Sequence, residues 1–245
     1  MTAAVQETRT TNDGVHFGPV ELDLLATHAG ARFPFPLRVP EFGRIEGERA
    51  VLLAAAGVTL RSRGLAGERG PLGVAAEVVT ALRECRGTVD LVLTGRAGTA
   101  GVVAMVYRSW TLICRQHLTG DAAGDGVRVR RVAQNALADE LFAMVPAAEP
   151  IVTMPITIPP GGADPAALGE LGVVLPELTG SGHLGATRDG ARAGAELSWL
   201  DGPRGRVRVN RADDGWLSVN SLRQNEMRLA LNDLATIARR EHDGH

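Results

Sequence analysis

Residues that could carry catalysis or bind metal are few in this sequence, and they are scattered along it. The six histidines form no pair spaced four residues apart and no carboxylate-flanked cluster: His16, His28, His117, His183, His242 and His245. A structural zinc site needs about four converging nitrogen, sulfur or oxygen ligands. The two cysteines, Cys85 and Cys114, each lie in an apolar stretch and lack metal-type spacing, which indicates buried free thiols. The sequence therefore predicts no metal site and no cofactor.

Three further patterns resemble catalytic motifs but do not complete one. Gly180-Ser181-Gly182-His183 is not the Gly-x-Ser-x-Gly nucleophile motif, and it is interpreted as a loop that leads into a strand. Asp139 and Glu140 are adjacent, so on a helix their carboxylates diverge by about 100°. The glycine-rich stretch 95–101 lacks the Lys-Ser/Thr ending of a phosphate-binding loop. We expect no catalytic residue and no enzyme activity.

The composition is that of a folded globular protein without a strong electrostatic field. Of 245 residues, 44% are hydrophobic and 22% charged, and the net charge is −2. All 26 basic residues are arginine. Such a balance does not attract nucleic acid or an anionic membrane. The sequence contains no signal-peptide pattern and no apolar run of about 18 residues, so we expect a cytoplasmic protein without membrane insertion.

The first third of the sequence has mainly helical periodicity. Apolar residues at helical spacing predict helices over 19–28, 44–63 and 71–86. Gly64 is placed to end the second helix, and Pro71 to begin the third. Between the first two helices, residues 37–39 are expected to form a short strand.

Two runs of strands follow, each closed by a helix. The first run comprises predicted strands over 89–94, 101–107, 111–118 and 127–131, with a helix over 133–145. The second comprises a short helix over 164–174, strands over 183–188, 195–200, 205–210 and 216–220, and a final helix capped by Ser221 with Gln224 as its partner. Between the runs, residues 146–165 hold six prolines and predict an extended connector, with one edge strand over 151–158.

The two runs look like copies of one unit. Residues 127–145 align with 217–235 at a constant offset of 90 without a gap. Four positions are identical, in the pairs Val129 and Val219, Gln134 and Gln224, Asn135 and Asn225, and Leu141 and Leu231. Two such units bury most surface by joining edges into one sheet. We therefore expect one α+β domain with quasi-twofold symmetry, made of halves 1–145 and 166–245 joined by the connector 146–165.

In this order the elements resemble the EspG family of type VII (ESX) secretion chaperones. The resemblance rests on loose motifs along nearly the whole chain: Val20-Glu21-Leu22-Asp23-Leu24-Leu25, Leu37-Arg38-Val39-Pro40, the helix 46–64 with Leu60-Arg61-Ser62-Arg63-Gly64-Leu65, Val89-Asp90-Leu91, Arg204-Gly205-Arg206-Val207 and Gly215-Trp216-Leu217-Ser218-Val219. It implies a central antiparallel sheet flanked by two helical bundles. It also implies a cytosolic chaperone that binds helical-hairpin secretion substrates, as PE–PPE-like or WXG-motif pairs, and keeps them soluble before export.

A chaperone of this kind needs an exposed apolar patch with a polar rim. The candidate is the run that contains Val173, Val174, Leu175 and Leu178, and the competing interpretation places that run in the core. A second reading of the whole chain is a winged-helix DNA-binding regulator, in which the helix 71–86 would enter the major groove. That helix carries Arg83 and Arg86 against Glu77 and Glu84, which disfavours this reading. Pairing of sheet edges is also compatible with a homodimer.

Overall fold

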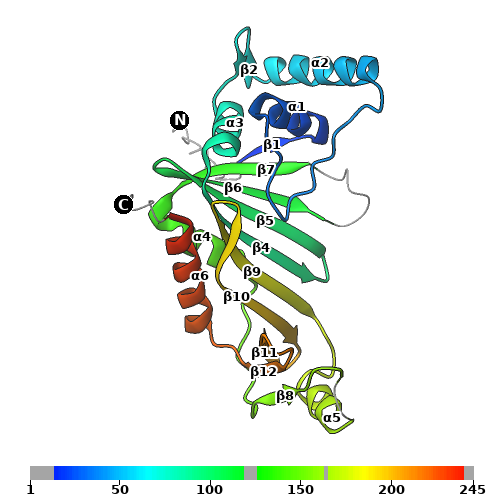
Figure 1. Ribbon diagram of the computed structural model, residues 1–245, viewed down its shortest axis with the longest axis vertical. Coiled ribbons are helices and arrows are strands. Elements are labelled where there is room, and N and C mark those ends of the chain that lie inside the picture. Colours follow the sequence, from blue (N-terminus) through cyan, green and yellow to red (C-terminus); the bar gives the residue numbers. More distant parts are fainter. Residues whose placement is uncertain (1–13, 119–125, 163–164, 240–245) are drawn as a thin grey trace, which may run out of the picture.

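The computed structural model describes residues 14–118, 126–162 and 165–239, and its centre is one ten-stranded antiparallel sheet (Figure 1). The strand order is β1-β7-β6-β5-β4-β9-β10-β11-β12-β8. The strands are β1 (Val15–Phe17), β4 (Gly87–Gly95), β5 (Gly98–Tyr107), β6 (Trp110–His117), β7 (Val127–Ala133), β8 (Ile156–Ile158), β9 (Gly180–Arg188), β10 (Ala191–Gly202), β11 (Gly205–Arg211) and β12 (Leu217–Ser221). A separate small hairpin pairs β2 (Ala66–Gly67) with β3 (Gly70–Pro71).

The helices lie on both faces of this sheet. They are α1 (Pro19–Ala29), α2 (Glu46–Ser62), α3 (Val74–Glu84), α4 (Leu137–Phe142), α5 (Pro165–Val174) and α6 (Gln224–Arg239), with a 3₁₀ turn at Gln134–Ala136. On one face, α3 packs on β5–β7 and carries α1 and α2, while α5 packs beside β8 at the far end of the sheet. On the other face, α4 and α6 pack against each other, and α6 crosses the central strands (Figure 1).

The sheet has the quasi-twofold arrangement that the repeat predicts. β4 and β9 pair at its centre, from Gly87 opposite Arg188 to Thr94 opposite Ser181. Counting outward from this pair, β5, β6 and β7 match β10, β11 and β12. The short strands β1 and β8 close the two ends, and α4 and α6 follow the matching strands β7 and β12. The expected α+β fold with a joined sheet is confirmed.

Alternation of side chains along the strands builds a separate core on each face. In β5, Val102 and Ala104 face α4 and α6, while Val103 and Met105 face α1 and α3. The same period in β10 directs Trp199 toward α6. A third cluster lies under α5 at the far end of the sheet. The near-continuous apolar sequence of β5 follows from burial on both faces.

Several local predictions are wrong, and each error has a physical reason. Residues 37–39 are irregular, because the side chain of Gln116 takes both backbone hydrogen bonds of Arg38, at 2.7 and 2.9 Å. The third helix begins at Val74 and not at Pro71, since Gly70 and Pro71 belong to the small hairpin. The first interaction joins residues far apart in the sequence, and the second involves strands of two residues. Neither produces a periodic pattern of apolar residues.

The C-terminal boundaries also differ. Ser221 does not cap α6, because it pairs with Val207 in the sheet; the backbone N–H of Arg223 donates instead to Glu226, at 2.7 Å. The helix expected over 133–145 is a 3₁₀ turn followed by the short α4, since the chain turns away before the prolines of the connector. The edge strand is limited to β8, and Asp164 lies outside the described residues. The division into two halves and a connector stays a prediction.

Candidate partner-binding surface

The two thiols do not form a reactive pair. Cys114 is completely buried in β6, and this burial raises the pKa of its thiol to about 12. Cys85 follows α3, and burial raises its pKa as well. A thiol is nucleophilic as the thiolate, so both are inert near neutral pH. Among the described residues, no group of three or more His, Cys, Asp and Glu side chains could hold a metal ion. His242 and His245 lie outside those residues.

A hydrogen-bonded serine and histidine do occur on the open face of the central strands. The Nδ1 atom of His183 lies 2.9 Å from the Oγ atom of Ser198, while Ser181 is not its partner. On its other side, Nε2 of His183 lies 3.2 Å from a guanidinium nitrogen of Arg192. The same Nε2 atom lies 3.8 Å from a carboxylate oxygen of Glu196. His183 therefore links Ser198 to the charged pair of Arg192 and Glu196.

Arg192 reaches this position because β10 contains a bulge. The register to β9 shifts between Ala193 and Leu197. Next to this irregularity, Nε of Arg192 lies 2.7 Å from Oε1 of Glu196. Arg192 also pairs with the buried carboxylate of Asp90 in β4. The hydrogen bond that Arg192 donates to Asp90 is the largest cause of the raised pKa of Arg192. The cluster ties β4 to β10 across β9.

The remaining motif residues have structural positions. Gly182 belongs to β9 and not to a loop, and a Cβ atom there would lie 1.9 Å from the ring of Trp199. The carboxylates of Asp139 and Glu140 diverge as expected, since Asp139 pairs with Arg228 of α6 and Glu140 with Arg130 of β7. Gly182 therefore makes room for the ring of Trp199, and the two carboxylates form ion pairs within the fold.

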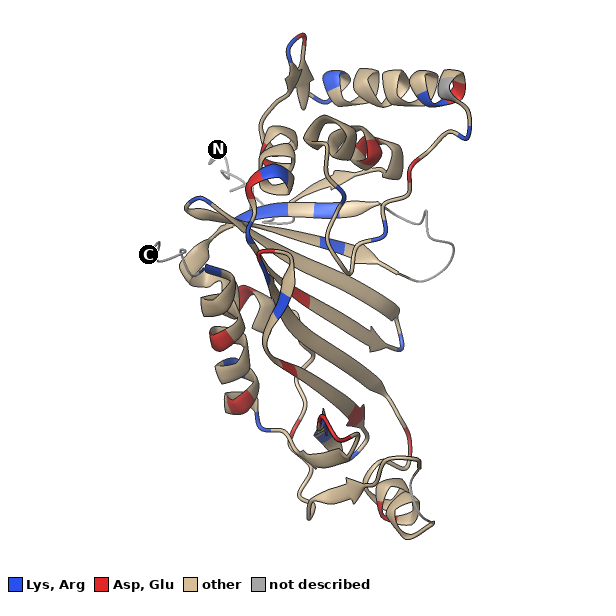
Figure 2. Ribbon diagram, viewed as in Figure 1, with Lys and Arg blue, Asp and Glu red and all other residues tan. Residues whose placement is uncertain are grey.

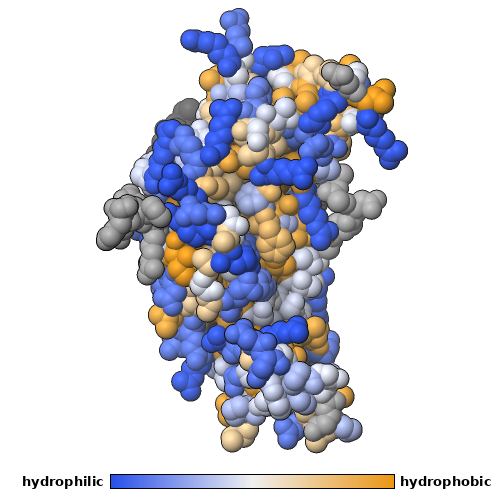
Figure 3. Space-filling model, viewed as in Figure 1, coloured by the Kyte–Doolittle hydropathy of each residue, from blue (hydrophilic) through white to orange (hydrophobic). Residues whose placement is uncertain are grey.

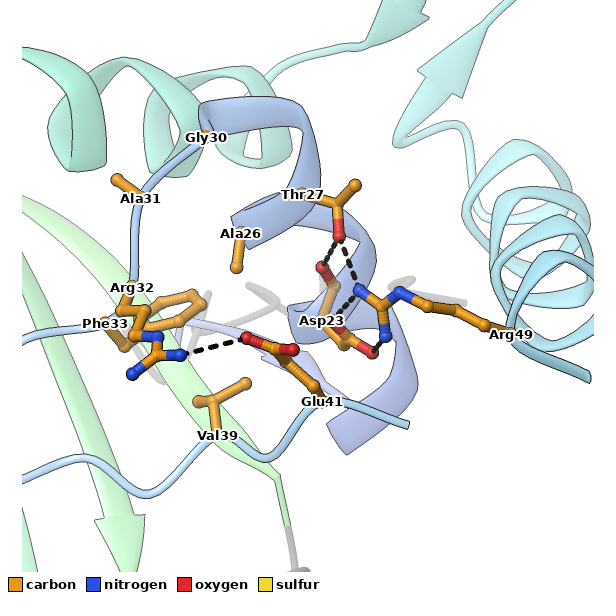
Figure 4. Close-up of a pocket in the computed structure, with 10 residues that line it drawn as sticks. All are labelled: Asp23, Ala26, Thr27, Gly30, Ala31, Arg32, Phe33, Val39, Glu41 and Arg49. Carbon is orange, nitrogen blue, oxygen red and sulfur yellow. Dashed lines mark hydrogen bonds and ion pairs between the residues drawn. The ribbon is translucent and has the colours of Figure 1, made fainter. Parts of the chain in front are cut away.

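A cavity of about 550 Å³ opens between α1, the loop that follows it and the start of α2. Figure 4 shows that Arg49 reaches from α2 to Asp23 and Thr27 of α1. The side chain of Asp23 is 2% exposed, and Arg49 binds both of its oxygens, at 2.7 and 2.8 Å. The hydrogen bond to Asp23 raises the pKa of Arg49. The four charged residues that line the cavity form two ion pairs, Asp23 with Arg49 and Glu41 with Arg32, and the first pair anchors α2 to α1.

The charged residues of α3 are also engaged within the fold. Arg83 donates to the backbone carbonyls of His28 and Ala29 at the end of α1. Glu77 pairs with Arg131 of β7, and Glu84 pairs with Arg108. The helix itself packs on β5, β6 and β7. In this arrangement α3 supports the sheet and is not a protruding helix of the kind that enters a DNA groove.

The predicted binding run is divided between core and surface. Val174 is buried, and Leu175 packs over Gly202 in the cluster under α5. Val173 and Leu178 point outward, with exposed fractions of 63% and 60%. Arg204 donates to the backbone carbonyl of Val173 at 2.8 Å, which fixes the end of α5 to the turn between β10 and β11. Two residues of the run are therefore exposed and two are packed against the fold, and its role in partner binding stays a prediction.

Further apolar side chains are exposed in the same part of the fold. We define the α5 surface as five large hydrophobic residues from α5 and its flanking segments, each more than half exposed: Val152, Met154, Leu168, Val173 and Leu178. The α5 and β8 elements lie together at one end of the molecule (Figure 1). Val152 and Met154 were missed by sequence reasoning. The signal was available, because the proline-rich connector carries large apolar residues next to prolines, which limit pairing in a sheet.

Comparisons with known proteins match the whole architecture. The model of the EspG family matches residues 19–233. Among solved structures, the chain is similar to the Mycobacterium tuberculosis type VII secretion system chaperone EspG5, determined in complex with a PE25–PPE41 dimer. The TM-score is 0.64 at 14% sequence identity, and the match covers 91% of this chain and 96% of that one. A search of curated protein sequences finds no match.

The described helices include none that is long and apolar enough to span a membrane. The family match extends from α1 almost to the end of α6 and so includes both halves of the sheet. The resemblance inferred from scattered motifs is confirmed at the level of the family and of the fold. This chain belongs to the EspG family.

Proposed function

We propose that this protein is a cytoplasmic chaperone of a type VII secretion system and not an enzyme. Its substrate would be a secreted helical-hairpin pair of the PE–PPE kind, or a related WXG-motif pair, which it keeps soluble before export. The observation that carries the proposal is the family match over residues 19–233, together with the shared fold of EspG5, a chaperone solved with a PE–PPE dimer. No cofactor is part of this function.

The α5 surface supports the proposal as the place of contact. Its five residues expose apolar area in a part of the fold that is attached to the sheet by a buried cluster and by Arg204. An apolar surface on a rigid base is what a chaperone needs to cover the apolar tip of another protein. Binding of this kind is by apolar contact and requires no catalytic side chain on the surface.

The test separates binding from folding. The double variant Val173→Asp/Leu178→Asp changes only side chains that point outward, so its melting temperature should stay within about 2 °C of the parent. Its affinity for the co-expressed helical-hairpin pair should fall on the order of 100-fold, since charges would have to be buried in an apolar contact. The matched control is Leu229→Asp on α6, where the leucine is 62% exposed. Unchanged binding by the double variant would reject this surface.

The substrate itself is best identified from the genome. Neighbouring genes for short helical WXG-motif proteins, for PE–PPE pairs or for a type VII ATPase would supply the pair to co-purify. Failure of every such pair to bind the parent protein would reject the proposed function as a whole. A salt-dependent shift of duplex DNA would instead favour the winged-helix reading.

A further inference from the structure

The helix α2 has an inner face that is docked and an outer face that is not. Inner residues include Arg49, Ala56 and Leu60, which lie on the side of α1. The outer positions recur with alternating spacings of four and three residues, and all are exposed: Gly47, Val51, Ala54, Val58 and Arg61. This is the heptad spacing with which a helix packs along another helix.

The outer face of α2 is apolar over most of its length. No charged residue occurs between Arg49 and Arg61. Figure 2 shows the middle of the helix without charge, and Figure 3 shows hydrophobic side chains at the surface along it. Val51 is 69% exposed and Val58 is 58% exposed, and Ile45 just before the helix is 69% exposed. A helix that is apolar on all sides is normally buried, so this face lacks a partner in the single chain.

The charges at the two ends of the helix indicate which partner fits. Glu48 lies in the first turn and Arg61 in the last, and both are exposed. We infer that α2 pairs with the α2 of a second copy of this chain, antiparallel and about a twofold axis near Ala54. This arrangement sets Val51 beside Val58 of the other copy, and Glu48 beside Arg61. The small residues at Ala54 and Gly47 allow the two helices to approach closely.

Other routes to a dimer are less favourable in this fold. The two edges of the sheet are β1 and β8, each three residues long, so edge pairing would form few hydrogen bonds. The helix α2 has 17 residues, which makes it about 26 Å long. One such helix pair buries less than the roughly 1,200–2,000 Å² of a standard stable interface. The dimer should therefore be weak, with a dissociation constant in the range of about 10–100 μM.

Sedimentation velocity of the purified chain from about 2 to 300 μM tests this inference. The parent protein should shift from monomer toward dimer with rising concentration. The double variant Val51→Asp/Val58→Asp should stay monomeric throughout, because it would bury four carboxylates at the axis. Leu229→Asp on α6 is the control, and it should dimerise like the parent. A monomeric parent at 300 μM would overturn the inference.

A charge exchange tests the antiparallel register. Glu48→Arg alone and Arg61→Glu alone should each weaken the dimer about 3- to 10-fold, because each sets like charges side by side across the axis. The combined Glu48→Arg/Arg61→Glu variant should recover the affinity of the parent, since the opposite charges meet again. Failure of the combined variant to recover would reject the antiparallel pairing.

The same variants distinguish this inference from the proposed function, on which it does not depend. Val173→Asp/Leu178→Asp should dimerise normally even where it no longer binds the helical-hairpin pair. If Val51→Asp/Val58→Asp loses that pair and leaves the sedimentation of the chain unchanged, the α2 face belongs to the secretion substrate, and the dimer is rejected. Thermal melting of every variant within about 2 °C of the parent shows that the fold is retained.

Discussion

Arg206 of β11 donates two hydrogen bonds to Asp201 of β10, from Nε to Oδ1 at 2.6 Å and from Nη2 to Oδ2 at 2.9 Å. Only 3% of Arg206 is exposed, and its guanidinium lies 5.3 Å above the ring of Trp199. The same side chain donates to the backbone carbonyl of Pro146, at 2.9 Å. Its backbone N–H donates to the carbonyl of Glu149, at 2.7 Å. One residue thus attaches the proline-rich connector to the sheet.

Replacement of Arg206 by methionine should lower the free energy of unfolding by about 3–5 kcal/mol, because Asp201 would remain as an unpaired, largely buried charge. Urea denaturation measures this loss. The control Arg211→Met, at an exposed position of the same strand, should change stability by less than about 0.5 kcal/mol. The double variant Asp201→Asn/Arg206→Met should regain part of the loss. A single variant as stable as the parent would contradict the role of this pair.

Gly182 should tolerate no side chain. The Cβ atom of alanine would lie 1.9 Å from the indole of Trp199, so Gly182→Ala should lower the free energy of unfolding by about 1–3 kcal/mol. Gly169→Ala in the exposed part of α5 has nothing within 4 Å of the added atom. It should stabilise the helix by about 0.5–1 kcal/mol. Denaturation curves of the two variants should give changes in the free energy of unfolding of opposite sign. Equal changes would contradict the prediction.

The repeat predicts matching energetics at Leu141 and Leu231. These residues align at the offset of 90 and are both 0% exposed in the cluster between the sheet and the helices α4 and α6. Substitution of either by alanine should cost about 2–5 kcal/mol of unfolding free energy, because each leaves a cavity in the same core. Leu229→Ala, which removes an exposed side chain, is the control. A large effect at only one of the two leucines would contradict their equivalence.

The buried thiol predicts loss of stability at alkaline pH. Burial raises the pKa of Cys114 to about 12, above the value of about 8.5 in an unfolded chain. The folded state therefore favours the protonated thiol, and its contribution is complete below pH 8.5 and decreases as pH rises toward 12. Each pH unit in this window should cost about 1.4 kcal/mol for this group.

Denaturation curves at pH 7, 8.5 and 10 measure this slope, and Cys114→Ala should reduce it. Native Cys114 should also resist a disulfide reagent at pH 8 until the protein unfolds. Rapid labelling of Cys114 in the native state would show that it is accessible. Burial also raises the pKa of Tyr107 to about 12, so further destabilisation is expected above pH 10.

Most of the fold could be predicted from local patterns. Period-two and period-3.6 apolar spacing located the eight long strands and the six α-helices, with errors in some of their bounds, because each element must present an apolar face to a core. The offset between Leu141 and Leu231 predicted the joined sheet, since two one-sided units bury more surface together. The short strands β1, β2 and β3 were missed, because two or three residues are too few to establish a period.

Residue by residue, the candidate surface could not be predicted in the same way. Val173, Val174, Leu175 and Leu178 have similar side chains, and the sequence alone identified only an apolar run next to loop-forming residues. Packing over Gly202 decides that Leu175 is partly buried, and the turn after α5 leaves Leu178 exposed. These outcomes depend on contacts with β10, about 25 residues away along the chain.

The sequence by itself determined the class of fold, its internal repeat and the family, because these depend on the order and periodicity of elements. Only the tertiary structure decided which apolar residues remain exposed on α2 and near α5, and which charges are neutralised. Pairs such as Asp23 with Arg49 and Asp90 with Arg192 join segments 26 and 102 residues apart. Burial and ion pairing of this kind depend on which residues are neighbours in three dimensions, and the local sequence does not specify those neighbours.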